Sequence, residues 1–102
     1  MKTVIISESA ESDLFEASAF YELQELGVGD YLFESLLVDI EKLSVLHGVH
    51  SLRCGYFKML ATKFPHGIYY EDLTDSVRVV AVLDLRRNPE WIRQQLGTRK
   101  KS

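Results

Sequence analysis

The sequence predicts one α+β domain over residues 1–102: an N-terminal strand, an antiparallel helical hairpin packed on one face of a curved, mainly antiparallel β-sheet, and a short C-terminal helix. Two observations predict this fold class. Apolar residues recur every three or four positions through residues 8–47, as the buried face of a helix requires. After Gly48 they alternate with polar residues or form short runs rich in Val, Ile and Tyr, which is typical of strands. A chain of 102 residues suffices for a single core.

The first half of the chain divides into a strand and two helices. Residues 2–7 have the β-branched content of a strand, and Ser7 is placed to cap a helix because two glutamates follow it. Gly27 ends this first helix, and Asp30 is placed to cap the second. The apolar positions of the two helices are Ala10, Leu14, Ala17, Tyr21, Leu32, Phe33, Leu36, Leu37, Ile40 and Leu43. Because the connection is short, the helices must be antiparallel neighbours.

The second half predicts a sheet followed by a helix. The expected strands are 50–53, 56–64, 67–73 and 76–85, with a bulge or tight turn at Cys54-Gly55 and a turn at Thr74-Asp75. Strict alternation in the last strand would place Arg78, Val80, Val82, Asp84 and Arg86 on one face. Pro89 begins a short helix over 90–96, and we expect residues 97–102 to be a frayed basic tail.

The net charge of −3 hides an asymmetry between the two halves of the chain. Residues 1–50 hold two basic and ten acidic residues, whereas residues 51–102 hold ten basic and five acidic ones. Such polarity predicts a basic surface for an anionic partner. The alternative is that acidic helices simply pair with basic strands within the fold.

Composition argues against several classes of protein. The apolar run 4–6 is too short for a signal peptide or a membrane span, so we expect no membrane partner. A lone cysteine, Cys54, cannot form an internal disulfide, which favours the cytoplasm, and we expect it to be a packing or edge residue rather than a nucleophile. The three histidines match no zinc-site spacing, and no phosphate-binding glycine loop is present. We therefore expect neither a metal nor a cofactor.

Residues 63–92, KFPHGIYYEDLTDSVRVVAVLDLRRNPEWI, combine several short motifs. Their Phe-Pro-His start, I-Y-Y strand, V-x-V-x-A-V strand and R-R-x-P-x-W exit resemble, in this order, the C-terminal half of the RelE/ParE superfamily of bacterial toxins. The upstream elements fit the same family, so the resemblance covers nearly the whole chain. It implies a cytoplasmic toxin of a type II toxin–antitoxin pair that inhibits growth and forms a hetero-oligomer with a cognate antitoxin.

Three functions remain open within that resemblance. The leading one is ParE-like inhibition of DNA gyrase by binding, which the R-R-x-P exit at residues 86–89 favours. The second is a RelE-like, ribosome-dependent mRNA endonuclease, in which Lys58, Arg78 and Arg86 would be the catalytic residues that stabilise a charged phosphate. The third is a non-toxic relic that only binds its antitoxin. Whether the protein is an enzyme is therefore undecided.

Two departures favour the ParE-like function over the RelE-like one. The isoelectric point is near 5.6, whereas RelE-like nucleases are strongly basic. No tyrosine follows Trp91 in the last helix, where RelE-like sites place a phenol. Asp84 departs from the family pattern in another way: the family often has histidine there, so a role that needs an imidazole is not expected, and Asp84 is placed to pair with Arg86. Trp91 is expected to pack the last helix onto the domain.

The binding surface is expected to use the basic residues of the second half. Apolar residues of the helical hairpin would receive an amphipathic antitoxin helix, and the basic sheet face would suit the acidic residues of the antitoxin, a small acidic protein. The alternative for Lys58 and Arg78 is that they are only solvated sheet residues. The residues expected to contact the antitoxin or target are Arg53, Lys58, Lys63, Arg78, Arg86 and Arg87.

Overall fold

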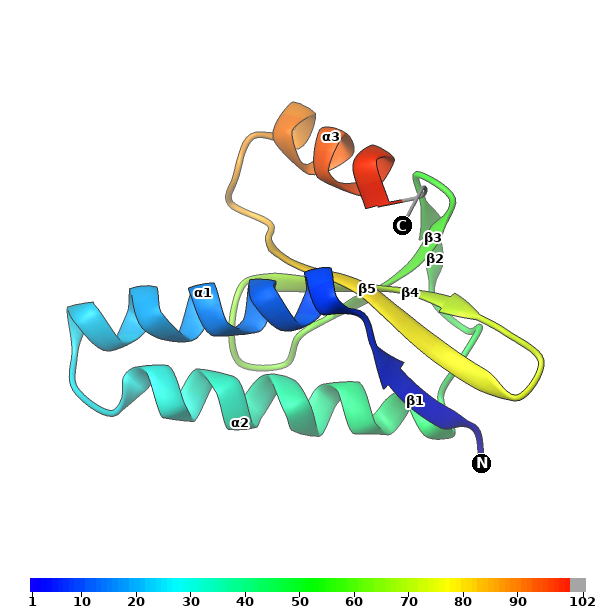
Figure 1. The fold of residues 1–102 in the computed structure, drawn as a ribbon, viewed down its shortest axis with the longest axis horizontal. Coiled ribbons are helices and arrows are strands. Elements are labelled where there is room, and N and C mark those ends of the chain that lie inside the picture. Colours follow the sequence, from blue (N-terminus) through cyan, green and yellow to red (C-terminus); the bar gives the residue numbers. More distant parts are fainter. Residues whose placement is uncertain (100–102) are drawn as a thin grey trace.

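The computed structural model describes residues 1–99 and has the predicted α+β architecture (Figure 1). The elements in chain order are β1 (Thr3–Ile6), α1 (Glu8–Gln24), α2 (Val28–Glu41), the 3-10 turn η1 (Lys42–Ser44), β2 (Ser51–Arg53), β3 (Tyr56–Leu60), β4 (His66–Asp72), β5 (Ser76–Asp84) and α3 (Pro89–Arg99). No helix in this described part of the chain is long and apolar enough to cross a membrane.

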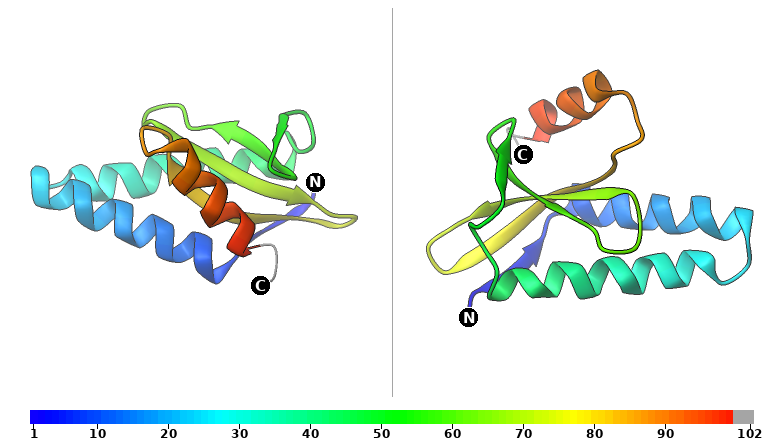
Figure 2. Two further views of the ribbon diagram at one scale, coloured as in Figure 1. Left: turned by 90° about the horizontal axis from the view of Figure 1, so that it is seen from above. Right: turned by 180° about the vertical axis from the view of Figure 1, so that it is seen from behind.

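The five strands form one mixed sheet in the order β1-β5-β4-β3-β2. Three of the four strand contacts are antiparallel, as expected, and β1 pairs with β5 in parallel. The α1–α2 hairpin covers one face of the sheet, and α3 lies against the other (Figure 2). We call these the hairpin face and the α3 face.

Each face of the sheet has its own core. The core under the hairpin joins apolar residues of both helices to the sheet: Ala10, Leu14, Leu32, Leu36, Ile40, Leu43, Met59, Ile68, Tyr70, Val77, Val79 and Val82. The smaller core under α3 consists of Tyr56, Tyr69, Val80, Ala81, Leu83 and Leu96. Six of the ten predicted helical positions are therefore buried and four (Ala17, Tyr21, Phe33 and Leu37) are partly buried, and the sheet is covered on both faces.

The alternation of β5 breaks at Val80. Tyr70 pairs with Val79 and Tyr69 pairs with Ala81, so Val80 is an extra residue in a β-bulge. Side chains beyond the bulge change face, and Val80 and Ala81 both lie in the α3 core. The prediction that residues 78–86 alternate without interruption was therefore wrong, because the alternation of one strand cannot reveal a bulge that depends on pairing with its neighbour.

The N-terminal cap of α1 matches the prediction, and that of α2 differs from it. Ser7 Oγ accepts a hydrogen bond from the Ala10 N–H at 3.1 Å and caps α1, as predicted. At α2 the expected cap, Asp30, is replaced by Glu22 of α1, whose carboxylate accepts from the N–H groups of Gly27 (2.8 Å) and Gly29 (2.9 Å). A cap supplied by the preceding helix leaves no local signal in the sequence of the capped helix.

Three element ends also differ from the predictions. Helix α2 ends at Glu41 and is followed by η1, whereas Gly48 was expected to end it near residue 47. Strand β3 ends at Leu60 rather than 64, because buried Asp39 accepts hydrogen bonds from both the N–H and the hydroxyl of Thr62 at 3.0 Å and draws the chain towards α2. Helix α3 continues to Arg99, so residues 97–99 are helical rather than frayed. Residues 100–102 of the expected tail lie outside the described residues.

Candidate functional site

The six basic residues proposed for binding fall at three places. Lys58 and Arg78 lie on the α3 face, and Arg53 borders it at the β2–β3 turn. Arg86 and Arg87 lie at the exit from β5. Lys63 is in the β3–β4 loop with its Nζ 5.2 Å from the ring centroid of Tyr31, beside the hairpin.

On the α3 face, Arg53 and Lys58 line a cavity of about 260 Å³ between β3, β4 and α3, which we call the α3 groove. Its lining residues are Arg53, Cys54, Lys58, Tyr69, Leu85, Pro89, Ile92, Arg93 and Leu96. None of these described lining residues is acidic, and Arg93 pairs with Glu90 just outside the groove, so the positive charge of the groove comes mainly from Arg53 and Lys58. Arg93 was not predicted, because the sequence does not show which side of a short, weakly amphipathic helix faces the sheet.

A tight turn positions the basic residues of the α3 groove. Cys54 and Gly55 have φ values of 55° and 85°, and they join β2 to β3 so that Arg53 pairs with Tyr56. This confirms the predicted turn, with Cys54 exposed at its first central position. Two residues further along β3, Lys58 pairs with Tyr69 and shares its face of the sheet.

The phenols of this face are buried. Burial raises the pKa of the Tyr56 and Tyr69 hydroxyls above their ordinary value, so both stay protonated at neutral pH. A protonated phenol can donate a hydrogen bond but does not serve as a general base. Arg78, on the same face, pairs with Glu71 at 3.3 Å, so part of its charge is neutralised within the fold.

Arg86 lies on the opposite face from Lys58 and Arg78. Its Nη2 is 2.7 Å from Asp84 Oδ2 and donates to the Tyr21 hydroxyl of α1 at 2.9 Å. The hydrogen bond from Arg86 holds the pKa of the Asp84 carboxyl below its usual range, so the predicted ion pair is present. Lys58, Arg78 and Arg86 therefore do not lie together, as the nuclease alternative would need, because the bulge at Val80 moves the end of β5 to the hairpin side.

Exposed Arg87 and partly buried Trp91 form a second feature at this exit. The Arg87 Cζ lies 3.8 Å from the ring centroid of Trp91, a cation–π arrangement. Trp91 packs against the core under α3, which confirms its predicted packing role. Within residues 1–99 the guanidinium of Arg87 makes no ion pair, so its charge is available to a partner.

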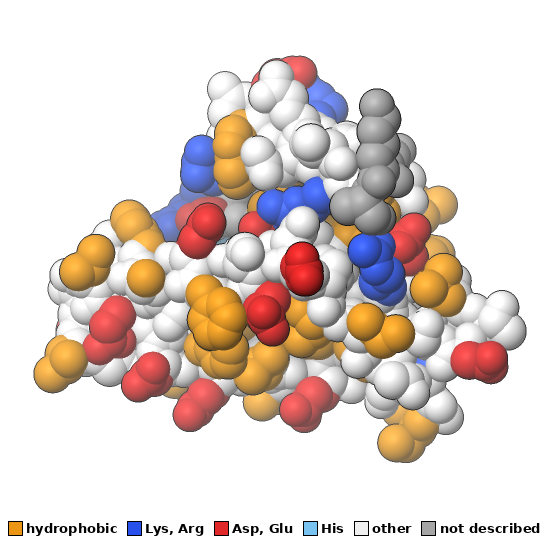
Figure 3. Space-filling view, in the orientation of Figure 1, with side chains coloured by type: hydrophobic (Ala, Val, Ile, Leu, Met, Phe, Trp, Pro, Cys, Tyr) orange, Lys and Arg blue, Asp and Glu red, His pale blue; other side chains and the backbone are white. Residues whose placement is uncertain are grey.

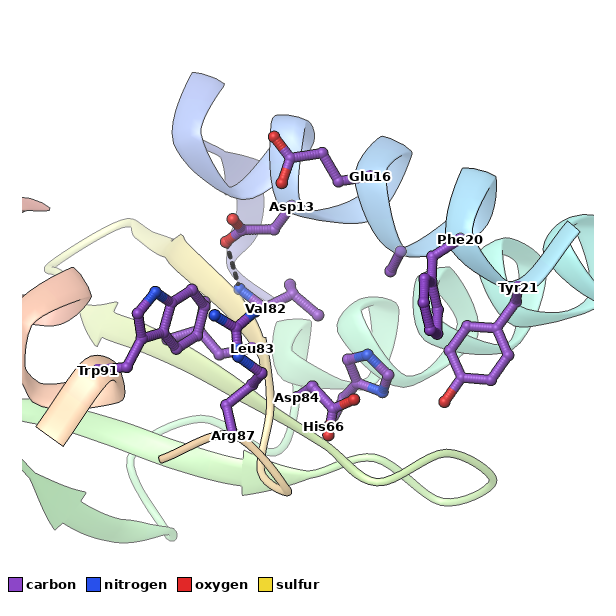
Figure 4. A pocket seen from close by; sticks show the side chains of 11 residues that line it. Asp13, Glu16, Phe20, Tyr21, His66, Val82, Leu83, Asp84, Arg87 and Trp91 are labelled. Atoms are coloured by element: carbon purple, nitrogen blue, oxygen red, sulfur yellow. Dashed lines mark hydrogen bonds between the residues drawn. The ribbon is translucent and has the colours of Figure 1, made fainter. Parts of the chain in front are cut away.

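Between α1, β5 and α3 lies a second cavity of about 340 Å³, the corner cavity (Figure 4). It is lined by Asp13, Glu16, Ala17, Phe20, Tyr21, His66, Val82, Leu83, Asp84, Arg87 and Trp91. His66 is 3% exposed, and its Nδ1 has no hydrogen-bond partner among residues 1–99. Burial lowers the pKa of His66, so the ring is neutral at neutral pH. His66 was noted only as part of the Phe-Pro-His motif, because the residues that surround it come from α1 and β5, which are distant in the chain.

No protein-family model and no curated protein matches the sequence. Among solved structures, the chain is similar to one from the chromosomal ParDE TA system of P. aeruginosa, with a TM-score of 0.72 and 11% sequence identity. The superposition covers 80% of this chain and 94% of that chain. At this identity the likeness concerns the fold, and the fold agrees with the one implied by the resemblance in sequence.

Proposed function

We propose that this protein is the toxin of a type II toxin–antitoxin pair and that it inhibits DNA gyrase by binding, in the manner of ParE. Two observations support the proposal: the fold is that of a chain from a ParDE system, and the charged groups that a nuclease would need are divided between two faces. The second observation carries the choice of mechanism. Arg86, bound by Asp84 and Tyr21, faces α1 rather than Lys58.

The α3 groove is the part of the molecule that we assign to the target. Arg53 and Lys58 give it positive charge, to which Arg93, paired with Glu90, adds less, while Ile92 and Leu96 give it an apolar floor. A groove of this composition suits an acidic, partly apolar protein segment. In the cytoplasm the antitoxin would neutralise the toxin by covering this groove within a hetero-oligomer.

A RelE-like endonuclease is the second candidate, and one observation favours it. The same groove brings three cations beside the hydroxyl-bearing side chain of Tyr69, and cations of this kind can bind a phosphate. Against it stand the placement of Arg86 and the raised pKa of both phenols, because cleavage through a 2′-hydroxyl needs a proton acceptor. The third candidate, an inactive antitoxin-binding relic, has the same fold.

The functions differ in what the purified protein does. We expect it to block supercoiling of plasmid DNA by gyrase and to leave mRNA intact in a translating extract. Lys58→Ala/Arg93→Ala should weaken the inhibition about tenfold or more, whereas Lys42→Ala, an exposed cation at the end of α2, should not. Cuts in ribosome-bound mRNA that vanish in Lys58→Ala would establish the nuclease instead. No growth defect on induction, with capture of a co-expressed antitoxin intact, would indicate the relic.

A further inference from the structure

The outer side of the helical hairpin carries an unusual distribution of charge. Residues 3–41, which include both helices, contain no lysine and no arginine but ten acidic residues. Only two of the ten, Asp13 and Asp39, form ion pairs within residues 1–99. Glu22 caps α2. The alternative that acidic helices are neutralised by basic strands therefore accounts for little of this charge.

Five of the remaining carboxylates flank an apolar line between the helices. Phe15 of α1 stacks on Phe33 of α2, with ring centroids 5.5 Å apart, and Phe15 is 56% exposed. Because residues three, four or seven apart share a helix face, two acids of α1 lie on the same face as Phe15, and three acids of α2 lie on the same face as Phe33 and Leu37. Figure 3 shows this arrangement over the hairpin, with apolar side chains bordered by acidic ones. The flanking residues are Glu8, Glu11, Asp30, Glu34 and Glu41, and we call the whole set the acidic seam.

This arrangement is unfavourable for the isolated domain. Asp30 and Glu34 are four residues apart on α2. Glu8 and Glu11 are three apart on α1, but both stand in its first turn, where the helix dipole offsets their repulsion. Like charges at these spacings repel and destabilise a helix by a few tenths of a kcal/mol per pair. The exposed ring of Phe15 also stays in contact with water, which is unfavourable, unless a partner covers it. Both costs are relieved by a partner that brings apolar side chains to the middle and cations to the two sides.

We propose that the acidic seam is the docking surface for a basic amphipathic helix of a partner protein. An apolar ridge of that helix would lie on Phe15 and Phe33, and Lys or Arg on both of its flanks would meet the carboxylates. If the partner is the antitoxin, that identification rests on the proposed function, but the chemistry of the segment does not. The acidic part of an antitoxin suits the α3 groove on the other side of the sheet, so one partner could carry both segments.

The test uses three synthetic peptides of about 20 residues, a length of roughly 30 Å that spans the hairpin. The first places Leu on one helical face and Lys on the rest, the second replaces every Lys by Glu, and the third scrambles the Leu and Lys positions. Fluorescence anisotropy with the full-length protein measures binding at low and high salt. We expect the first peptide to bind, the second not to bind, and the scrambled peptide to bind at least about tenfold more weakly.

Variants of the protein locate the site. Glu34→Lys/Glu41→Lys should weaken binding of the first peptide at least about tenfold. Asp75→Lys/Glu90→Lys, an equal charge change away from the hairpin, should leave the affinity within about twofold. Circular dichroism melts of all variants verify that the fold is kept.

Three results would overturn the proposal. One is equal binding of the ordered and scrambled peptides, which means that net charge alone attracts them. Another is no binding of the first peptide, or binding that the Glu34→Lys/Glu41→Lys variant retains. The last is a homodimer, seen by sedimentation, that dissociates in this variant, because the seam would then pair two copies of the chain. None of these measurements depends on toxicity, so failure of the proposed function remains distinguishable.

Discussion

Removal of the Asp13 carboxylate tests what holds α3 on the sheet. Asp13 of α1 accepts hydrogen bonds from both terminal nitrogens of the Arg99 guanidinium, with Nη2–Oδ1 at 2.9 Å, and from the Val82 N–H at 2.9 Å. The side chains of Asp13 and Arg99 are 10% and 12% exposed, so solvent can replace few of these bonds. Asp13→Ala therefore leaves a cation largely buried without this carboxylate and a buried N–H without its acceptor.

Breaking one partner of a buried ion pair costs about 3–5 kcal/mol, and the residual exposure lowers the expected loss to about 2–3 kcal/mol. For a domain of 102 residues this corresponds to a fall in Tm of roughly 10–20 °C. Asp13→Asn should lose less, because its amide oxygen can still accept from Val82. A double-mutant cycle with Arg99→Ala isolates the pair energy.

Thermal and urea unfolding measure the loss, and the fluorescence of Trp91 reports α3 because this is the one tryptophan in the chain. We expect Asp13→Ala to shift the Trp91 transition below the transition seen by far-ultraviolet circular dichroism, because α3 detaches first. An Asp13→Ala variant that unfolds within about 0.5 kcal/mol of the parent protein would refute the reasoning. It would mean that the apolar contacts of Leu96 and Ile92 hold α3 without the ion pair.

Three further expectations concern single positions. Gly29→Ala should destabilise the fold by more than about 1 kcal/mol despite the helix preference of alanine, because a Cβ there would lie 2.3 Å from the Ser18 carbonyl oxygen. The matched variant Gly97→Ala should stabilise the fold, because no described atom lies within 4 Å of the added Cβ. Cys54→Asn should raise Tm, since φ at this position is 55° and Asn-Gly is the preferred pair for such a hairpin turn; no change in the melting curve would contradict this. Burial lowers the pKa of His66, so the unfolded state takes up its proton first as pH falls below about 6.5, and stability should decline there. Urea titrations at pH 7.5 and 5.5 should show a smaller decline in His66→Gln, and an equal decline would show that other groups cause it.

Local sequence patterns account for most of the fold. The spacing of Leu14 and Leu32 with their neighbours predicted the buried stripes of both helices, because burial against one sheet face imposes the helical period. Ser7 and Gly55 were also predictable, since a cap and a tight turn depend on adjacent residues. The ends of α2 and β3 were not, because side chains from α1 and α2 determine them across the fold.

The candidate site was predictable in its residue types but not in its grouping. Sequence singled out the cations of the second half, yet which of them act together depends on the bulge at Val80. Without the bulge, Arg78 and Arg86 would share a face; with it, Arg86 turns to Tyr21 of α1. One extra residue in the strand pairing thus separates Arg78 from Arg86, which strict alternation along the strand had placed on one face.

The two faces of the sheet also explain why the isoelectric point is weak evidence about the target. The acidic seam lies over the hairpin, whereas the α3 groove opens on the other side of the sheet. Charges in solvent that are more than about 8 Å apart are largely screened at physiological salt, so an anion that approaches the groove responds mainly to the cations that line it. The chain as a whole is therefore acidic, with a pI near 5.6, although the groove is locally positive. The placement of Arg86 and the protonated phenols therefore disfavour a nuclease, and the charge of the whole chain adds little to them.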